Sequence, residues 1–423
     1  MNRNTLWGTF AVILLLGLAV LVSKQEASSI SPLNQSATAP KLMVSQSDQL
    51  NQLVNANNHF GFALFAQLQP QKSQPQNIFI SPQSIAIALA MTRNGTGRTT
   101  QAEMTQVLGL EQFDAATVNA SYAELIKTLN SADGDLELAI ANSLWVNQNI
   151  SLKQQFIKTT QDFYQGSLTN LDFSNPSAKN KINQWVASKT ANQIPEIVDS
   201  ISPEDALYLI NAIYFKGNWT NKFDPNATTE QPFYLDSNQT KPVAMMSQTG
   251  DYRYYENEQF QAIRLPYGKQ GQLGMYIFLP QKNSSLKQFN QQLNLANWQE
   301  WLKQMRSQSG NISLPKFKLE YDTELKDVLS SLGMQQAFNF AQADFSAMTD
   351  SAVAINTVKH KAVIEVNEEG TEAAGVTSTG IRITSIPQQP FNMNIDRPFF
   401  CAIGDDSTET LLFMGNVVNP QQN

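Results

Sequence analysis

The stretch that decides the fold of this chain is Glu368-Glu369-Gly370-Thr371-Glu372-Ala373-Ala374-Gly375. From Gly370 to Ile386 the sequence contains no proline, and its only charged residues are Glu372 and Arg382. The remaining positions are small or β-branched residues, which a β-sheet accepts readily. The segment is therefore predicted to be able to join a sheet as an additional strand.

Alternation along this segment supports the prediction, because successive side chains of a strand face opposite sides of the sheet. One face would carry Thr371, Ala373, Gly375, Thr377, Thr379 and Ile381. The other face would carry Glu372, Ala374, Val376, Ser378 and Gly380. The first face is uncharged and suited to burial, whereas the second leaves the acidic residue in water. A flexible surface loop has the same composition, so the segment alone does not decide between the two structures.

Sequence blocks elsewhere in the chain distinguish these two interpretations. In order they are NIFISP at 77–82, NAIYFKGNW at 211–219, LPKF at 314–317, VNEEGTEAA at 366–374, DRPFF at 396–400 and FMGNVVNP at 413–420. Through these six blocks the chain resembles the serpins from about Gln49 to Pro420. The match is strongest at 366–374, which corresponds to the hinge of the serpin reactive-centre loop.

The resemblance implies an α+β serpin fold with three β-sheets, about nine helices and an exposed reactive-centre loop at about residues 368–390. A chain of 423 residues would usually contain two or more domains. No internal linker rich in proline, glycine or serine separates the blocks, so we expect one domain at residues 49–420. A polar linker is predicted at residues 24–48.

The resemblance also implies a function, which is suicide-substrate inhibition of serine-type endopeptidases. The protease cuts the loop, and the loop then inserts into sheet A as a strand. Family spacing from the hinge places the reactive bond between Thr384 and Ser385, with Arg382 as the runner-up. Thr384 predicts an elastase-like or subtilisin-like protease as partner, whereas Arg382 would predict a trypsin-like one. The alternative function is that of a non-inhibitory serpin-fold binding protein or scaffold.

Two internal control regions are implied for such a fold. The shutter, where the sheet opens, would contain Ser81, Ser84, Asn211 and His360. The breach, where the loop enters, would contain Trp219, Lys316 and Glu368, with Lys316 paired to Glu368.

His360 can also be placed from its neighbours. It shares a strand face with Val358, Ala362 and Ile364, so it should be buried and hydrogen-bonded. Asn211 is a candidate partner because it interrupts an apolar run, and a buried amide needs hydrogen bonds. Ser81-Pro82 is typical of a helix N-cap followed by a first-turn proline.

Residues 6–22 form an apolar run after Arg3, which predicts a signal peptide or signal-anchor helix within residues 1–23. Export to an extracellular or periplasmic location follows from either interpretation, with membrane tethering if the segment is retained. The net charge of −7 and the absence of a dense Lys/Arg cluster argue against a nucleic-acid partner. We expect a monomer.

The sequence offers little material for an enzyme. The two histidines are His59 and His360, and no Gly-x-Ser-x-Gly, paired-histidine zinc or phosphate-loop motif occurs. The single cysteine, Cys401, lies among apolar residues, where a thiol behaves as a small buried hydrophobe. No catalytic residue, metal or cofactor is therefore predicted. A membrane-anchored serine hydrolase that uses one of the histidines is the other alternative.

Overall fold

A computed structural model of the chain describes residues 45–69, 76–130, 136–235, 239–371 and 389–420. The predictions for residues 1–23, for Glu372 to Gly375, and for Arg382, Thr384 and Ser385 lie outside the described residues. Helix α1 begins at Gln46, three residues before the predicted start of the domain, because Ser45 caps its N-terminus by accepting a hydrogen bond from the Asp48 amide. Within the described ranges, no helix is long and apolar enough to cross a membrane.

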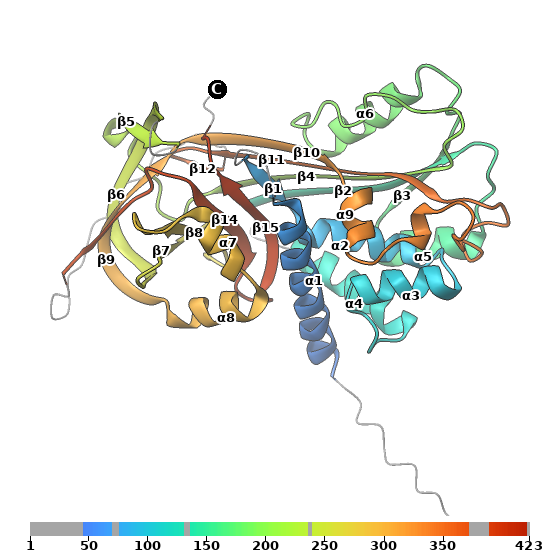
Figure 1. The fold of residues 1–423 in the computed structure, drawn as a ribbon, viewed down its shortest axis with the longest axis horizontal. Helices are drawn as coiled ribbons and strands as arrows, with labels where there is room; N and C mark the ends of the chain where they lie inside the picture. The colour runs from blue at the N-terminus through green and yellow to red at the C-terminus, as the bar shows by residue number, and fades with distance from the viewer. Residues whose placement is uncertain (1–44, 70–75, 131–135, 236–238, 372–388, 421–423) are drawn as a thin grey trace, which may run out of the picture. The chain divides into compact units, whose positions relative to one another are not determined.

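Helices surround two β-sheets, so the α+β class is confirmed (Figure 1). In the described ranges the helices are α1 (Gln46–Leu68), α2 (Pro82–Arg93), α3 (Arg98–Val107), α4 (Ala115–Asn130), α5 (Gln154–Tyr164), α6 (Ala178–Lys189), α7 (Leu286–Gln292), α8 (Leu295–Gln304) and α9 (Lys326–Ser331). Two short 3-10 turns, η1 (Pro225–Ala227) and η2 (Gln336–Phe338), complete the helical elements. The predicted cap of α2 is confirmed, because the Ser81 side chain accepts a hydrogen bond from the Ser84 amide and Pro82 occupies the first turn.

The six-stranded sheet carries the elements that the sequence singled out. Its order is β10 (Phe317–Glu324), β11 (Ile355–Val366), β4 (Leu207–Asn218), β2 (Leu136–Asn147) and β3 (Ser167–Leu171), with β12 (Gly370–Thr371) paired to β4. The central pair β4 and β11 is parallel, whereas β10 and β2 flank it in antiparallel pairs. The boundary between β4 and β11, which we call the seam, is therefore a parallel junction inside the sheet.

The remaining strands form one nine-stranded sheet. Its order is β1 (Ile78–Ile80), β15 (Thr410–Val417), β14 (Phe399–Asp405), β8 (Leu273–Pro280), β7 (Phe260–Pro266), β6 (Thr240–Glu256), β9 (Arg306–Pro315) and β13 (Phe391–Asn394), with β5 (Thr229–Tyr234) paired to β6. The described strands thus form two hydrogen-bonded sheets where three were expected. The reason is β6, whose 17 residues pair with β5 near one end, with β7 near the other, and with β9 along the opposite edge.

Both faces of the six-stranded sheet are covered around β4, which explains why this strand is almost continuously apolar. Leu209, Ile213 and Phe215 belong to the main hydrophobic core, together with α1 and α2. Ile210 and Ala212 point the other way, into a second core formed with α6. Figure 1 shows α6 on one side of the sheet and α1 and α2 on the other.

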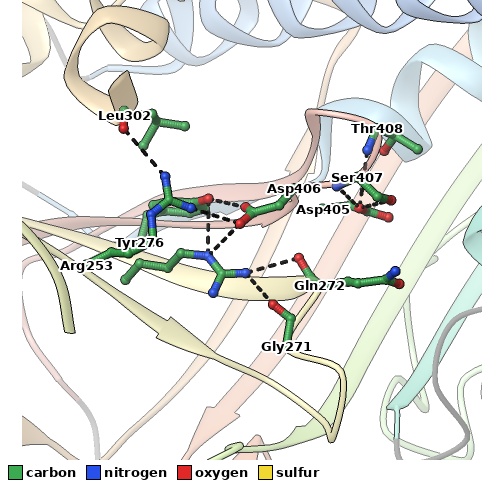
Figure 2. Close-up of polar contacts among 10 residues, drawn as sticks. Arg253, Gly271, Gln272, Tyr276, Leu302, Asp405, Asp406, Ser407 and Thr408 are labelled. Carbon is green, nitrogen blue, oxygen red and sulfur yellow. Dashed lines mark hydrogen bonds and ion pairs between the residues drawn. The ribbon is translucent and has the colours of Figure 1, made fainter. Parts of the chain in front are cut away.

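A cluster of charges fastens the turn after β14 to the nine-stranded sheet, as Figure 2 shows. Asp406 Oδ2 lies 2.9 Å from Arg253 Nη1 and 3.1 Å from Arg264 Nε, and its other oxygen accepts a hydrogen bond from the Tyr276 hydroxyl. Burial, followed by the negative charge of Asp406, raises the pKa of Tyr276 to about 12. Gly274 makes room for this arrangement, because a Cβ there would lie 2.6 Å from the Arg264 guanidinium carbon.

Candidate functional site

The seam places two of the predicted shutter residues directly opposite each other. His360 of β11 is the register partner of Asn211 of β4, and their side chains point to the face covered by α2. His360 Nδ1 lies 2.6 Å from Asn211 Oδ1, and neither residue is more than 1% exposed. A side-chain hydrogen bond therefore crosses the seam beneath the backbone ladder.

Ser81 and Ser84, at the N-terminus of α2, complete a hydrogen-bond network with Asn211 and His360, which we call the shutter network. The Ser81 amide donates to His360 Nε2 at 3.3 Å, which makes Nε2 an acceptor and puts the ring proton on Nδ1, facing Asn211. The Asn211 amide nitrogen then donates to the Ser84 hydroxyl and to Asn142 Oδ1 on the neighbouring strand β2. Both ring nitrogens of His360 and both side-chain polar atoms of Asn211 thus have partners, as buried polar groups require.

Burial decides the protonation state of the histidine. Desolvation lowers the pKa of His360 from 6.5 to about 3, because a cation would lose its hydration in this core. The Ser81 amide, which occupies Nε2 as a donor, disfavours the doubly protonated ring as well. His360 is therefore neutral at physiological pH and works as a positioned hydrogen-bonding group.

At one end of the seam, Trp219 holds the turn that leads out of β11. Its indole nitrogen donates to the Asn367 carbonyl at 2.9 Å, and its main-chain amide donates to the Glu369 carbonyl at 2.9 Å. The indole ring stacks on Tyr267, with ring centroids 4.4 Å apart and an interplanar angle of 14°. Trp219, predicted for the breach, thus fixes the backbone immediately before the loop.

The two carboxylates of the hinge each pair with a lysine. Lys316 Nζ lies 2.8 Å from Glu368 Oε2, and the Thr228 hydroxyl donates to Glu368 Oε1 at 2.8 Å. Burial alone would raise the pKa of Glu368, but the hydrogen bonds from Lys316 and Thr228 outweigh it and the pKa is lowered. Glu369 pairs with Lys222. Each carboxylate is therefore held by a lysine at the base of the loop.

After Glu369 the chain reverses direction and lies beside the end of β4, on the edge that faces β11. We call this position at the end of the seam the slot. Asn367 and Gly370 exchange main-chain hydrogen bonds across the turn, and Thr371 then pairs antiparallel with Gly217 of β4. Leu136 of β2 pairs with Gly217 from the other side, so Thr371 occupies the edge of β4 that faces β11. Thr371 is fully buried, and its hydroxyl lies 3.0 Å from that of Tyr267.

Glycine is required at the turn into this slot. Gly370 has φ +146°, and a Cβ there would lie 2.1 Å from the Gly217 carbonyl oxygen and 2.6 Å from Asn218 Cα. Both the left-handed conformation and the close approach of β4 exclude a side chain. The hinge is thus docked against the end of β4 by two residue pairs, Gly370 with Asn218 and Thr371 with Gly217.

The structure brings together the predicted shutter residues Ser81, Ser84, Asn211 and His360, and the predicted breach residues Trp219, Lys316 and Glu368. Sequence reasoning missed Asn142, Tyr267, Thr228 and the Lys222–Glu369 pair. Each of these lies far along the chain from its partner. Only Asn142 carries a signal, since it is a polar residue inside the buried half of β2.

The groups that an enzyme would need are not gathered at this site. His59 is exposed on α1, whereas His360 is bonded within the core. Cys401 is buried, and desolvation raises the pKa of its thiol to about 12. Within the described ranges, no group of three His, Cys, Asp or Glu side chains could hold a metal ion.

Comparison with known proteins gives the same assignment for almost the whole described region. The family described as serpin (serine protease inhibitor) matches residues 55–420. An uncharacterized serpin-like protein of Thermococcus kodakarensis is 37% identical over 402 residues, which cover 93% of this chain and 92% of that protein. Human leukocyte elastase inhibitor is 36% identical over 88% of this chain and 100% of its own length.

Solved structures agree with the sequence comparison. The structure of human thyroxine-binding globulin superposes with a TM-score of 0.82 at 29% identity, covering 88% of this chain and all of that chain. The match to the family over residues 55–420, together with relatives above 30% identity that span nearly the whole chain, identifies the protein as a member of the serpin family.

Proposed function

We propose that this serpin inhibits serine proteases as a suicide substrate rather than acting as an enzyme. The protease cuts the reactive-centre loop and stays attached, as an acyl-enzyme, to the loop residue on the N-terminal side of the cut. The peptide on the C-terminal side is released from that bond with a new N-terminus. The protease is trapped when the cut loop enters the six-stranded sheet. The membership of this chain in a family of serine protease inhibitors supports the proposal. The hinge sequence at 366–374 and the hydrogen bonds of Asn211 and His360 across the seam support it as well.

One observation carries the proposal further than family membership does. Thr371 already pairs antiparallel with Gly217, in the slot that continues between β4 and β11. An inserted loop would extend this pairing, so that Thr377, six residues on from Thr371, would face Asn211, six residues back from Gly217. Its hydroxyl would then enter the shutter and replace the bond between Asn211 and His360.

The energy of insertion is comparable to the stability of a whole protein domain. A strand of about a dozen residues would add ladder hydrogen bonds at about 1 kcal/mol net each, or on the order of 10 kcal/mol. Domain stabilities are about 5–15 kcal/mol, so the uncut protein must be kinetically trapped. The hydrogen bonds that cross the seam and the hinge docked at its end would keep the uncut protein in this kinetically trapped state.

We further propose that the scissile bond joins Thr384 and Ser385. A small β-branched residue on the acyl side fits an elastase-like or subtilisin-like pocket, and the similarity to leukocyte elastase inhibitor agrees with that specificity. Arg382 remains the runner-up, for a trypsin-like protease. The apolar run at residues 6–22 supports export of the protein to an extracellular or periplasmic location, where such proteases act.

A second function is favoured by one comparison. Thyroxine-binding globulin, which superposes closely on this chain, has the serpin fold and is named for binding a small molecule. A binding protein would not need a hinge able to enter the sheet. The glycine turn and the buried Thr371 therefore favour inhibition.

The deciding experiment mixes the full-length protein with pancreatic elastase or subtilisin and separates the products on a denaturing gel. Inhibition predicts a complex that survives detergent. It also predicts a released C-terminal peptide whose mass is that of a fragment beginning at Ser385. A Thr384→Arg variant should transfer the reaction to trypsin, which tests the position of the bond. Clean cleavage without a complex by all three proteases would favour the binding-protein function.

A further inference from the structure

Helix α2 ends in a buried arginine at a point where four helices meet. Arg93, in the last turn of α2, is only 6% exposed, and its Nε donates to the Thr105 hydroxyl of α3. The next residue, Asn94, donates to Asn119 of α4 and to the Tyr164 hydroxyl of α5. Figure 1 shows these four helices on the side of the six-stranded sheet away from α6. We call this meeting point the helix junction.

The Arg93 guanidinium has too few acceptors for a buried cation. The Thr105 hydroxyl, 2.6 Å from Nε, is neutral and donates its own proton to the Gln101 carbonyl. Nη1 is buried and has no hydrogen-bond partner. Among the described residues Arg93 forms no ion pair, and the groups that influence its charge are the phenols of Tyr122 and Tyr164. Desolvation lowers the pKa of Arg93, yet a guanidinium keeps its proton in proteins.

The neighbouring groups do not supply the missing negative charge. The Tyr164 hydroxyl donates to Asn119 Oδ1 and accepts from the Asn94 amide, so its hydrogen bonds are already used. Burial raises the pKa of Tyr122 and of Tyr164, so both phenols stay neutral. The C-terminus of α2 contributes the equivalent of about half a negative charge. About half of the positive charge at the helix junction is therefore left unbalanced.

We propose that the helix junction binds a monovalent inorganic anion, such as chloride, at Arg93 Nη1. A buried cation is costly without an opposite charge, and an anion supplies both that charge and the missing acceptor. A water molecule would accept from Nη1 but would leave the charge unbalanced. Arg93, Asn119 and Tyr164 are all at least nine-tenths buried, which favours a monatomic ion over a phosphate or an organic acid. The inference is independent of the proposed inhibitory function.

The position of the anion gives it a role in stability. Helix α2 carries Ser84 of the shutter network in its first turn and Arg93 in its last turn. Nine residues of helix separate the two, or about 13 Å. An anion that neutralises Arg93 would stabilise the packing of α2 against α3, α4 and α5. The stability of the folded protein should therefore depend on chloride in particular and not only on ionic strength.

The test measures the melting temperature of the full-length protein from about 5 to about 500 mM chloride, with gluconate keeping the ionic strength constant. The site variant is Arg93→Met, which keeps an unbranched side chain and removes the charge. The matched control is Arg98→Met, which changes the net charge equally at a side chain that is 88% exposed. Wild-type crystals soaked in bromide provide a second measurement, which does not require the variant to fold.

The wild type and Arg98→Met should gain about 3 °C across this range, as a ligand at about a hundred times its Kd implies. Arg93→Met should show little of this gain. At the lowest chloride concentration it should melt no lower than the wild type, because it has lost an unpaired buried charge. An anomalous bromide peak should lie within hydrogen-bond distance of Arg93 Nη1.

Equal chloride dependence for the wild type and Arg93→Met would show that water alone contacts Nη1, and would overturn the proposal. Absence of a bromide peak at Arg93 would overturn it as well. A bromide peak without any chloride dependence of the melting temperature would mark an adventitious ion only, which also contradicts the site.

Discussion

The hydroxyl groups of Tyr267 and Thr371 lie 3.0 Å apart in the buried slot at the end of the seam. Tyr267 stacks on Trp219, and burial raises its pKa well above the usual value of 10, so the phenol stays neutral. The first loop residue that enters the sheet is therefore received by a preformed hydrogen-bonding group. This contact makes the hinge a docked element instead of a free connection.

Thr371→Arg should convert the protein from an inhibitor to a substrate. A guanidinium in this buried position would be desolvated beside Tyr267 without a carboxylate partner, so insertion would be slowed relative to deacylation. We expect the stoichiometry of inhibition against elastase to rise at least about 10-fold, with cleavage at the same bond. Thr371→Ser, which keeps the hydroxyl, is the control, and equal stoichiometry for Arg and Ser would contradict the role of this slot.

Gly370→Ala should release the hinge from the end of β4. The added Cβ would meet the Gly217 carbonyl at 2.1 Å in addition to the strain of φ +146°. We expect faster proteolytic cleavage within the hinge and slower inhibition. Gly333→Ala is the control for a strained glycine elsewhere, because Gly333, just after α9, has φ +117° but a Cβ there would have only a contact at 3.7 Å. The same hinge cleavage rate in both variants would mean that the substitution at Gly370 does not release the hinge.

Acidification should weaken the shutter through His360. Its pKa is lowered to about 3 in the folded protein and is about 6.5 when unfolded, so the unfolded state binds the extra proton between these values. The stabilisation is complete above pH 6.5 and is lost as the pH falls towards 3, by on the order of a few kcal/mol. The measurement is the rate of polymer formation on native gels from pH 7.5 to 4.5.

Wild-type polymerisation should accelerate below pH 6.5 more steeply than that of His360→Gln, which cannot take up the proton. The glutamine variant should also polymerise faster than wild type at pH 7.5, because the bond geometry to Asn211 and Ser81 is lost. Parallel pH profiles for the two proteins would assign the acid sensitivity to carboxylates elsewhere.

Reversing the charge of Glu368 at the breach should promote polymer formation, and reversing the charge of Lys316 as well should partly restore the monomer. Glu368→Lys replaces the ion pair between Lys316 and Glu368 with two neighbouring ammonium groups, which repel each other. It also leaves the Thr228 hydroxyl without its acceptor. The Lys316 side chain is 37% exposed, so the pair itself contributes only about 1 kcal/mol. We expect polymers on heating with Glu368→Lys, and fewer with the Glu368→Lys/Lys316→Glu double variant. Identical polymer fractions for the single and double variants would show that the two charges are not coupled.

Asp406→Asn should lower the thermal stability of the protein by several degrees. The guanidinium groups of Arg253 and Arg264 would lose their shared carboxylate, and the Arg264 side chain is only 7% exposed. Asp406 is one-third exposed, so we expect about 2–3 kcal/mol, below the 3–5 kcal/mol of a fully buried pair. Asp350→Asn is the control, because its pair with Lys153 is exposed and should contribute less than about 1 kcal/mol. Equal melting temperatures for both variants would refute a stabilising cluster.

The strand at Gly370–Thr371, the buried histidine and the cap of α2 could be predicted from sequence because each depends on nearby residues. Alternation placed His360 on an apolar face, and β11 buries it there. Ser81-Pro82 begins a helix wherever it occurs before an apolar run, and α2 begins there. The family resemblance supplied the pairing of Lys316 with Glu368, which no local pattern contains.

The sequence by itself thus determined the fold family and the α+β class, and it supplied the residues predicted for the hinge, the shutter and the breach. The tertiary structure alone decided that Thr371 meets Tyr267, that Asn142 closes the shutter network, that Glu369 pairs with Lys222, and that β6 merges two expected sheets into one. Local propensity and side-chain period depend on a few neighbouring residues. These contacts, by contrast, join positions such as Tyr267 and Thr371, 104 residues apart, which only the packing of the strands brings together.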